Sequence, residues 1–268
     1  MKKIKVVAAI IIKDNKVLAT RRSYGEFKNG WEFPGGKVEI GEDSKVALIR
    51  EIKEEISANL VIHKHFATIE YTYPNFHMQM ECYICSIDDF KLNSAIHDDA
   101  KWLDRNTLDS VQWLSADVKI VNRLKIYLSN KIAVSACLLG DNCKYNGGNN
   151  YDEIVEELLE NKTIIKVCPE NITKLGTPRE PVEISQGKVI NKKNEDLTEI
   201  YLEGVEKTWH KLENENIDLA ILKAKSPTCG SGKIYDGSFS HILIEGNGLL
   251  TKKLKAQGIQ ILSEQDLK

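Results

Sequence analysis

The chain has 268 residues, which is long enough for two domains of ordinary size, each with its own hydrophobic core. Lys and Arg total 37 against 39 Asp and Glu, so the formal net charge of -2 excludes the broad positive field of a protein that wraps nucleic acid. No apolar run approaches the length of a membrane span, and the run over residues 6–12 ends without a signal-peptide cleavage site. We therefore expect a cytoplasmic protein with neither nucleic acid nor membrane as a partner.

Residues 1–130 are expected to form a first domain in which strands surround one strong helix. The strand-like runs are residues 6–12, 16–20, 60–65, 67–73 and 77–87, and helices are predicted over residues 44–56 and 118–128. This order predicts an α+β domain in which the first helix packs on a mixed sheet.

The helix predicted over residues 44–56 concentrates carboxylates on one face. Glu51, Glu54 and Glu55 stand at positions i, i+3 and i+4, so their like charges repel one another. A hard divalent cation such as Mg²⁺ would relieve this repulsion, because it takes oxygen ligands and bridges to phosphates. A solvated acidic surface is the alternative interpretation.

A Gly-Gly turn at residues 31–37, Trp-Glu-Phe-Pro-Gly-Gly-Lys, lies just upstream and can bring backbone carbonyls against a bound metal. With the acidic helix it resembles the Nudix box, and residues 1–130 are similar to the MutT branch of Nudix hydrolases. The resemblance implies a Nudix fold that hydrolyses a nucleoside triphosphate to its monophosphate and pyrophosphate. It also implies that Mg²⁺ or Mn²⁺ is bound by the Gly36 carbonyl and by the catalytic carboxylates Glu51, Glu54 and Glu55, without fixing which of them is the base.

Three further residues are candidates for binding the nucleobase by the same resemblance. Arg22 matches an arginine near the base in MutT-like proteins, Phe33 is placed to wall the pocket, and Asp117 matches a base-reading acidic position. The alternatives are a solvated arginine, a core phenylalanine and a helix cap. One position departs from the family pattern, because Ser57 stands where Gly is usual.

After a boundary near Ser129-Asn130 the pattern changes, so residues 131–268 are expected to form a second domain. Strands are predicted over residues 131–136, 163–167, 217–223 and 258–262, and helices over residues 151–160, 198–214 and 248–256. Strands separated by helices predict an α/β, Rossmann-like domain with a largely parallel sheet and crossover helices.

The six cysteines are unevenly placed. Cys82 and Cys85 lie three apart in a predicted strand, so they point to opposite faces and are expected to be buried core residues. The other four lie at or just after the ends of strands in the second domain: Cys137, Cys143, Cys168 and Cys229. Such strand ends meet at one crevice of an open parallel sheet, where ligands bind. A zinc site and an iron–sulfur cluster are both held by thiolates, and the spacing leaves this choice open.

Over residues 131–268 the chain resembles the DUF523 family, whose characterised members are the TudS thiouracil desulfidases. The matching blocks are residues 134–148, 168–170, 178–184 and 225–232. The resemblance implies a [4Fe-4S] cluster held by Cys137, Cys143 and Cys229, with one iron left open to take the sulfur of a thiolated uracil. Cys168 is then spare.

By the same resemblance, Glu170 is the acid/base that handles water attack at the carbon losing sulfur, and Ser226 is a hydroxyl that orients the substrate. A surface carboxylate beside a helix start is the alternative for Glu170. Arg179 either pairs with Glu183 or contacts a phosphate. Lys174 lies in a loop that departs from the family pattern and favours a phosphorylated substrate.

The sequence thus predicts a bifunctional enzyme that acts on small nucleotides. One site would cleave a nucleoside triphosphate and the other would desulfurise a thiolated uracil base or nucleotide. The reactions would be sequential if thio-UTP is cleaved to thio-UMP, which is then converted to UMP. One alternative is cleaning of the nucleotide pool, with CTP or 8-oxo-dGTP as the first substrate. Another makes the second domain a zinc-stabilised or redox-sensing module that regulates the hydrolase.

Overall fold

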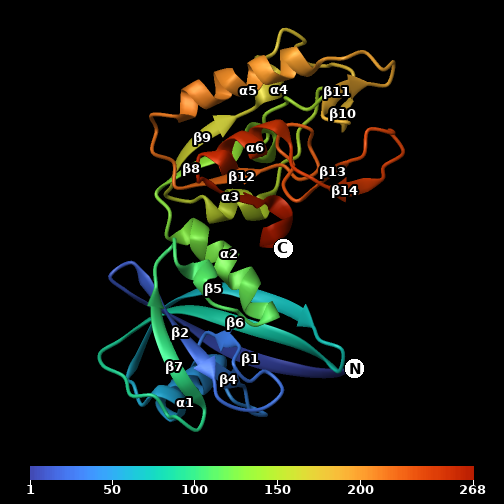
Figure 1. The fold of residues 1–268 in the computed structure, drawn as a ribbon. Coiled ribbons are helices and arrows are strands. Elements are labelled where there is room, and N and C mark those ends of the chain that lie inside the picture. The colour runs from blue at the N-terminus through green and yellow to red at the C-terminus, as the bar shows by residue number, and fades with distance from the viewer. The chain divides into compact units, whose positions relative to one another are not determined.

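The chain divides into two units, residues 1–128 and residues 129–268. The computed structural model describes all residues from Met1 to Lys268 (Figure 1). The first unit contains β1 (Lys2–Lys13), β2 (Lys16–Arg22), β3 (Trp31–Glu32), β4 (Gly35–Lys37), α1 (Ser44–Ile56), β5 (Leu60–Thr72), β6 (Phe76–Ile87), β7 (His97–Leu103), the 3-10 turn η1 (Leu108–Ser110) and α2 (Ser115–Tyr127).

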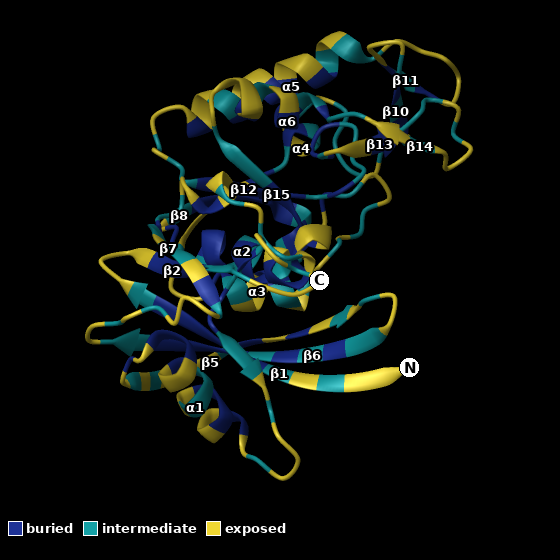
Figure 2. Ribbon diagram, turned by 60° about the horizontal axis from the view of Figure 1, so that its bottom comes forward, coloured by how far each residue is buried: buried dark blue, intermediate teal, exposed yellow.

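The sheet of the first unit has the strand order β3-β2-β1-β6-β5, with β4 beside β1 and β7 beside β2. It is mixed, as predicted, because β1 and β6 are parallel and the other pairs are antiparallel. Successive residues of β1 point to opposite faces: Val7, Ala9 and Ile11 pack with α1, whereas Ala8 and Ile10 pack with α2. A helix therefore covers each face of this sheet, whose central strands are buried (Figure 2).

The acidic helix α1 spans the predicted residues, Ser44–Ile56. Asp43 caps its start by accepting hydrogen bonds from the backbone N–H groups of Lys45 and Val46. Ser57 caps its end with φ 52° and ψ 27°, in the left-handed region that glycine adopts without steric cost. Ser57, which stands where the family pattern has Gly, therefore strains the end of the helix. The three carboxylates precede this strained position along the helix.

Some elements of the first unit differ from the prediction. β5 is one continuous strand with two register irregularities rather than two strands. α2 begins at Ser115, so Asp117 lies within its first turn instead of capping it. β7 was not predicted, because few of its residues are apolar, but it completes the sheet by pairing with β2. Cys82 and Cys85 are buried against opposite faces of the sheet, as predicted.

The second unit combines a four-stranded sheet with two small hairpins. Its elements are β8 (Lys131–Ser135), η2 (Ala136–Leu139), α3 (Glu153–Leu158), β9 (Thr163–Val167), α4 (Pro169–Ile172), β10 (Val182–Ser185), β11 (Lys188–Asn191), α5 (Thr198–Leu212), β12 (Leu219–Leu222), β13 (Lys233–Tyr235), β14 (Leu243–Glu245), α6 (Leu249–Ala256), β15 (Gln260–Ser263) and η3 (Glu264–Leu267). The hairpins β10–β11 and β13–β14 were not predicted, because their strands are only three or four residues long.

The larger sheet has the order β15-β12-β8-β9, and all its pairings are parallel. Ile132, Ala133 and Val134 of β8 are all fully buried, as expected for a strand that is covered on both faces. Helices α5 and α6 cover one of these faces through Val205, Leu250 and neighbouring apolar residues. The predicted parallel sheet is confirmed, and its description as Rossmann-like stays a prediction.

The order of these strands creates a crevice at one end of the sheet. β9 lies on one side of β8 and β12 lies on the other, so the chain changes direction between β8 and β12. At such a switch point, ligands bind outside the carboxyl ends of the strands. The segments that leave these ends begin at Ala136 after β8 and at Lys223 after β12.

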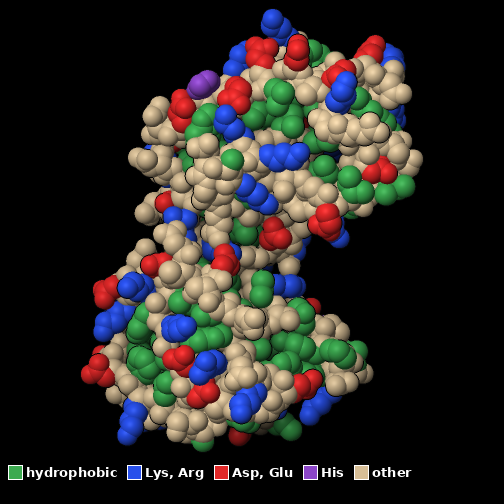
Figure 3. All heavy atoms as spheres, in the orientation of Figure 1, with side chains coloured by type: hydrophobic (Ala, Val, Ile, Leu, Met, Phe, Trp, Pro, Cys, Tyr) green, Lys and Arg blue, Asp and Glu red, His purple; other side chains and the backbone are tan.

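The surface carries charges of both signs. On the face of each unit that Figure 3 shows, Lys and Arg side chains are interspersed with Asp and Glu. This mixture matches the formal net charge of -2. None of the helices combines the length and the apolar character needed to cross a membrane.

Candidate active sites

In the first unit the Gly-Gly turn and the acidic helix come together. The backbone N–H of Gly35 donates to Oε2 of Glu55 at 2.9 Å. The Glu51 carboxylate lies against Gly36 so closely that a Cβ on Gly36 would collide with it. The Gly36 backbone and two of the three predicted carboxylates therefore share one site, where β4 meets α1.

The third carboxylate, Glu54, is more accessible. Its side chain is 57% exposed, and its Oε1 lies 3.8 Å from Nη1 of Arg50. Arg50 is held more closely by Oε2 of Glu42 and Oε1 of Glu51, each at 2.9 Å. One guanidinium thus offsets part of the negative charge that the helix concentrates, and Glu54 stays open to solvent.

Glu55 carries the clearest electrostatic sign of a metal site in this unit. Burial, followed by the nearby charges of Glu32 and Glu51, raises the pKa of Glu55 to about 8. A divalent cation would supply the positive charge that this carboxyl group lacks. The donor set consists of carboxylate and backbone carbonyl oxygens, which are the ligands that Mg²⁺ and Mn²⁺ prefer, so its chemistry fits either ion.

The three candidate nucleobase residues lie around Glu32. Arg22 donates from Nη1 to both carboxylate oxygens of Glu32, at 3.0 and 2.9 Å, so it is not a solvated arginine. Asp117 accepts from the backbone N–H of Phe33 at 3.1 Å, and burial together with the charge of Glu32 raises its pKa to about 8. Phe33 is buried and stacks on Trp113, with ring centroids 4.6 Å apart. The structure thus brings all three residues into one network.

Sequence analysis missed Glu32 and His97 in this network. His97 is fully buried; its Nε2 lies 3.1 Å from Oε1 of Glu32, and its Nδ1 has no hydrogen-bond partner. Glu32 could have been recognised in the sequence, because its carboxylate lies inside the largely apolar turn at residues 31–37. His97 reaches the site through the pairing of β7 with β2.

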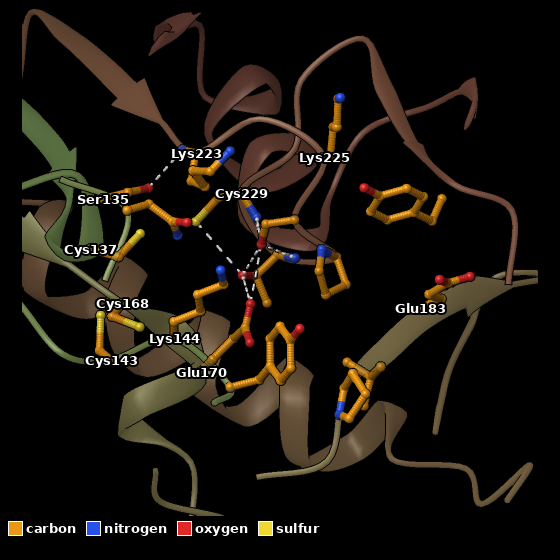
Figure 4. A pocket seen from close by; sticks show the side chains of 18 of the residues that line it. Ser135, Cys137, Cys143, Lys144, Cys168, Glu170, Glu183, Lys223, Lys225 and Cys229 are labelled. Carbon is orange, nitrogen blue, oxygen red and sulfur yellow. Dashed lines mark hydrogen bonds between the residues drawn. The ribbon is translucent and has the colours of Figure 1, made fainter. Parts of the chain in front are cut away.

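A cavity of about 390 Å³ lies at the carboxyl ends of β8, β9 and β12 in the second unit (Figure 4). Its walls contain the residues predicted for the second site, which are Cys137, Cys143, Glu170, Ser226 and Cys229, and also Cys168, which was predicted to be spare. Figure 4 shows the four cysteines toward one end, Glu183 toward the other, and Glu170 between them. The switch point of the sheet thus gathers residues that are far apart in the sequence.

The four thiols have different environments. Cys143 lies beside Cys137 and Cys168, where its thiol can donate to the thiolate of either. This proximity lowers the pKa of Cys137 to about 7 and also lowers the pKa of Cys168, whereas the pKa of Cys143 is raised. Burial raises the pKa of Cys229 to about 12, although the nearby Ser135 hydroxyl acts to lower it. Cys168 therefore lies with the predicted cluster ligands, not apart from them.

The donor chemistry of this end of the cavity fits a group bound by thiolates. Two of the thiols have lowered pKa values, and soft sulfur donors suit both zinc and iron–sulfur clusters. As the side chains stand, no three His, Cys, Asp or Glu residues of the chain converge closely enough to hold a single metal ion. The carboxylates of the first unit do not converge closely enough to hold a metal ion either.

Glu170 is enclosed by three donors. Its Oε2 accepts from Nη2 of Arg179 at 2.7 Å, and its Oε1 accepts from Oγ1 of Thr228 at 2.8 Å and from Oγ of Ser226 at 3.1 Å. The Ser226 oxygen in turn accepts from the backbone N–H groups of Thr228 and Cys229, at 3.1 and 3.0 Å. Glu170 is therefore no surface carboxylate, and the proton of Ser226 is directed toward it.

Three other residues near the cavity bear on its chemistry. Thr228, which was not predicted, also lies 3.7 Å from Sγ of Cys229, so it connects Glu170 with that thiol. Thr228 could have been recognised in the sequence, because it is a hydroxyl residue directly before the candidate ligand Cys229. Glu183 is not the partner of Arg179; it accepts at 3.0 Å from the backbone N–H groups that follow β13. Lys174 is exposed and does not line the cavity.

Comparison with known proteins identifies a family for each unit. A family model described as 2-thiouracil desulfurase matches residues 132–266, and a NUDIX domain model matches residues 2–125. The chain is 40% identical over 146 residues to the "Uncharacterized protein YbbK" of Bacillus subtilis, covering 51% of this chain and 97% of that protein. It is 31% identical over 126 residues to the 8-oxo-dGTP diphosphatase of Haemophilus influenzae, covering 46% of this chain and 93% of that enzyme.

A similar solved structure is described as the "[4Fe-4S]-dependent thiouracil desulfidase TudS", with 36% sequence identity and a TM-score of 0.49. The match covers 52% of this chain and 93% of that chain. The two family models place each unit in an enzyme family, which confirms the two predicted resemblances. This chain belongs to the 2-thiouracil desulfurase family through its second unit, and its first unit is a Nudix hydrolase domain.

Proposed function

We propose that this chain is a bifunctional nucleotide enzyme. The first unit hydrolyses a nucleoside triphosphate to its monophosphate and pyrophosphate, and the second unit replaces the sulfur of a thiolated uracil base or nucleotide with oxygen. If thio-UTP is the first substrate, its product thio-UMP is the second. The observation that carries the proposal is the single cavity that contains four cysteines and Glu170, in a chain that also has a Nudix domain.

In the first reaction, Glu51, Glu54, Glu55 and the Gly36 carbonyl would hold Mg²⁺ or Mn²⁺. Such an ion would supply positive charge for the phosphates and Lewis acidity for activating water. The chain itself positions Glu51 and Glu55 against the Gly-Gly turn, which sets where the phosphates lie. The network of Arg22, Phe33 and Asp117 binds the nucleobase.

In the second reaction, Cys137, Cys143 and Cys229 would hold a [4Fe-4S] cluster. Such a cluster would supply a Lewis-acidic iron for the substrate sulfur. Glu170 takes a proton from the water that attacks the carbon bearing sulfur, and Ser226 orients the substrate. The C–S bond breaks, a C–O bond forms, and sulfur leaves as sulfide with the protons of the water, so no electron donor is needed. Arg179 fixes the Glu170 carboxylate while this proton moves.

A second candidate substrate for the first unit is 8-oxo-dGTP. The observation that favours it is the match over 93% of the 8-oxo-dGTP diphosphatase of Haemophilus influenzae. In that case the two activities are unlinked, and the first unit cleans the nucleotide pool. CTP remains an alternative from the sequence resemblance. The family of the second unit argues for an enzyme and against a purely regulatory zinc or redox module.

The test supplies 4-thio-UTP and Mg²⁺ to anaerobically purified protein and follows both pyrophosphate release and loss of the thiocarbonyl absorbance. Glu54→Gln should block the conversion of 4-thio-UTP and leave that of 4-thio-UMP intact. Glu170→Gln should stop desulfuration and leave pyrophosphate release intact. Glu26→Gln, at an exposed position outside both sites, is the matched control.

Two results would contradict parts of this proposal. If Glu54→Gln converts 4-thio-UTP as fast as the unaltered protein, the reactions are not sequential. If the protein holds stoichiometric zinc without iron and acid-labile sulfide, the assignment of a [4Fe-4S] cluster is wrong. A panel of 4-thio-UTP, CTP and 8-oxo-dGTP, compared by kcat/KM for pyrophosphate release, separates the candidate substrates of the first unit.

A further inference from the structure

His97 lies in the nucleobase network of the first unit, and the proposed reaction gives it no role. Its imidazole is fully buried, with Nε2 at 3.1 Å from Oε1 of Glu32. A carboxylate oxygen accepts hydrogen bonds and does not donate them, so Nε2 carries the proton and donates to Glu32. The other ring nitrogen, Nδ1, has no hydrogen-bond partner. A buried polar atom without a partner destabilises the fold, so packing alone does not explain a histidine at this position.

A bulge between β7 and β2 puts His97 beside Glu32. Arg21 of β2 lies opposite Asp99. The next residue, Arg22, lies opposite His97, so Asp98 is an extra residue of β7. Asp98 is exposed, and its Oδ1 accepts from Nε of Arg21 at 2.7 Å, whereas the imidazole is turned to the interior. Bulges often re-aim a side chain beside an active site, and this bulge aims His97 at the nucleobase network.

The Glu32 carboxylate is held between two donors. Nη1 of Arg22 reaches its two oxygens at 3.0 and 2.9 Å, and Nε2 of His97 reaches one of them at 3.1 Å. The backbone carbonyl of Glu32 also accepts from Oγ1 of Thr20 at 3.3 Å. The Glu32 side chain is only 14% exposed, so these bonds leave its carboxylate a single orientation. The Arg22 guanidinium is in turn oriented by the carboxylate that it contacts.

The backbone of His97 is tied to the end of the helix that carries the metal carboxylates. The N–H of His97 donates to the Asn93 carbonyl at 2.9 Å. Asn93 in turn donates from its N–H to the backbone carbonyl of Glu55 at 2.8 Å and from Nδ2 to that of Glu54 at 3.3 Å. The imidazole therefore has a fixed position relative to α1, which lets it place Glu32 reproducibly.

We infer that His97 is a positioning residue for nucleobase binding in the first unit. By donating to Glu32, it fixes the carboxylate that orients Arg22 toward the base. This inference rests on the proposed hydrolysis of a nucleoside triphosphate and adds a determinant of its base specificity. The step at phosphorus does not depend on His97, because other groups hold the metal carboxylates: the Gly35 N–H for Glu55, and Arg50 for Glu51.

The test measures pyrophosphate release by the full-length protein with Mg²⁺. It compares the best of 4-thio-UTP, CTP and 8-oxo-dGTP with ribose 5′-triphosphate, which has no base. His97→Leu should lower kcat/KM for the nucleotide by about tenfold through a higher KM, the effect of one lost hydrogen bond to a charged group. The value for ribose 5′-triphosphate should change by less than about twofold, because the step at phosphorus is intact. His97→Gln places an amide N–H near the position of Nε2 and should recover most of the loss.

Two controls separate positioning from packing. His63→Leu changes an exposed histidine of β5, whose Nε2 lies 2.8 Å from Oγ of Ser86, and it should alter neither substrate. In a Glu32→Ala background, His97→Leu should cause no further loss, because the acceptor that it positions is already absent. An additional tenfold loss in that background would show that His97 acts by another route, which contradicts the inference.

A binding titration, which needs no turnover, distinguishes failure of this inference from failure of the proposed reaction. The ligands are the products 4-thio-UMP, CMP and 8-oxo-dGMP, with ribose 5-phosphate as the ligand that has no base. His97→Leu should weaken binding of the nucleotides and leave that of ribose 5-phosphate unchanged. Equal losses for both kinds of ligand, or a His97→Gln variant as impaired as His97→Leu, would overturn the positioning role. If the protein cleaves none of the triphosphates, the proposed hydrolysis fails, and the titration still decides whether His97 supports base binding.

Discussion

Arg179 donates from Nη2 to Oε2 of Glu170 at 2.7 Å, and the two side chains are only 3% and 15% exposed. Arg179 also donates to the backbone carbonyl of Cys143 at 3.0 Å, so one guanidinium links the proposed base to the loop of a proposed cluster ligand. Because both charges are largely withdrawn from water, each depends on the other for compensation.

Arg179→Met should destabilise the second unit by about 3 kcal/mol, because it leaves the enclosed Glu170 carboxylate without its cation. Urea denaturation of the single variant, of Glu170→Gln and of the double variant measures this effect as a double-mutant cycle. The double variant should be less destabilised than the sum of the two single variants. Strict additivity would show that the pair is not coupled.

Gly36→Ala should abolish pyrophosphate release while the first unit stays folded, because a Cβ at this position displaces the Glu51 carboxylate. Steady-state kinetics with a nucleoside triphosphate and a circular dichroism melt measure the two effects. Gly41→Asn serves as the control, since Gly41 has φ 82° and no neighbour within 4 Å, and Asn tolerates that conformation. Full activity of Gly36→Ala would remove Glu51 from the proposed ligands.

Ser57→Gly should stabilise the first unit by about 1 kcal/mol, because it relieves the left-handed conformation at the end of α1. Ser57→Ala keeps the steric cost and should show no gain. Chemical denaturation of both variants and of the unaltered protein measures these changes in the free energy of unfolding. If glycine gives no advantage over alanine, the conformation at position 57 differs from that described above.

Asp117→Asn should change how the stability of the first unit depends on pH. Burial and the charge of Glu32 raise the pKa of Asp117 to about 8, whereas an unfolded aspartate ionises near pH ~4. Between these values the folded protein holds a proton that the unfolded chain has lost, so the contribution of Asp117 to stability falls as pH rises from about 4 to about 8.

The free energy of unfolding of Asp117→Asn, relative to the unaltered protein, should therefore rise through this pH window and level off above it. The introduced amide would still accept the Phe33 N–H bond through its oxygen, which keeps the comparison local. Denaturation at a series of pH values supplies the measurement. Parallel stability profiles of the two proteins would show that Asp117 ionises normally.

Cys168→Ser should leave the iron and acid-labile sulfide content unchanged, whereas serine at Cys137, Cys143 or Cys229 should lower both. Cys168 lies in hydrogen-bond contact with Cys143, so its position alone does not separate it from the three proposed ligands. Metal analysis of the anaerobically purified variants makes the separation. Loss of iron from Cys168→Ser would make Cys168 a ligand.

Local patterns predicted the parts of the fold whose signals lie within a few residues. The helix Ser44–Ile56 was predicted at both ends, because an apolar stripe and the absence of Gly and Pro mark it. The ends of the parallel strands were also placed closely enough to predict that the cysteines share one cavity. β7 escaped prediction because its place depends on pairing with the distant β2.

Long-range contacts account for most of what the sequence did not reveal about the sites. Glu32 faces His97 across 65 positions of the chain, and Thr228 faces Glu170 across 58. No periodicity or spacing reports such contacts, since the sheet topology creates them. Arg179 shows the same limit, because the sequence offered Glu183 as its partner and the structure pairs it with Glu170.

The switch point of the second unit also links the proposed ligands to folding. Cys137 follows β8, whereas Cys229 follows β12, which is the third strand of the sheet along the chain. These thiols become neighbours only once the β8–β12 pairing has formed. Any group that they hold jointly therefore depends on this strand pairing as well as on the thiols. Such a group would in turn stabilise the β8–β12 pairing, because a ligand that binds only the folded state shifts the folding equilibrium toward that state.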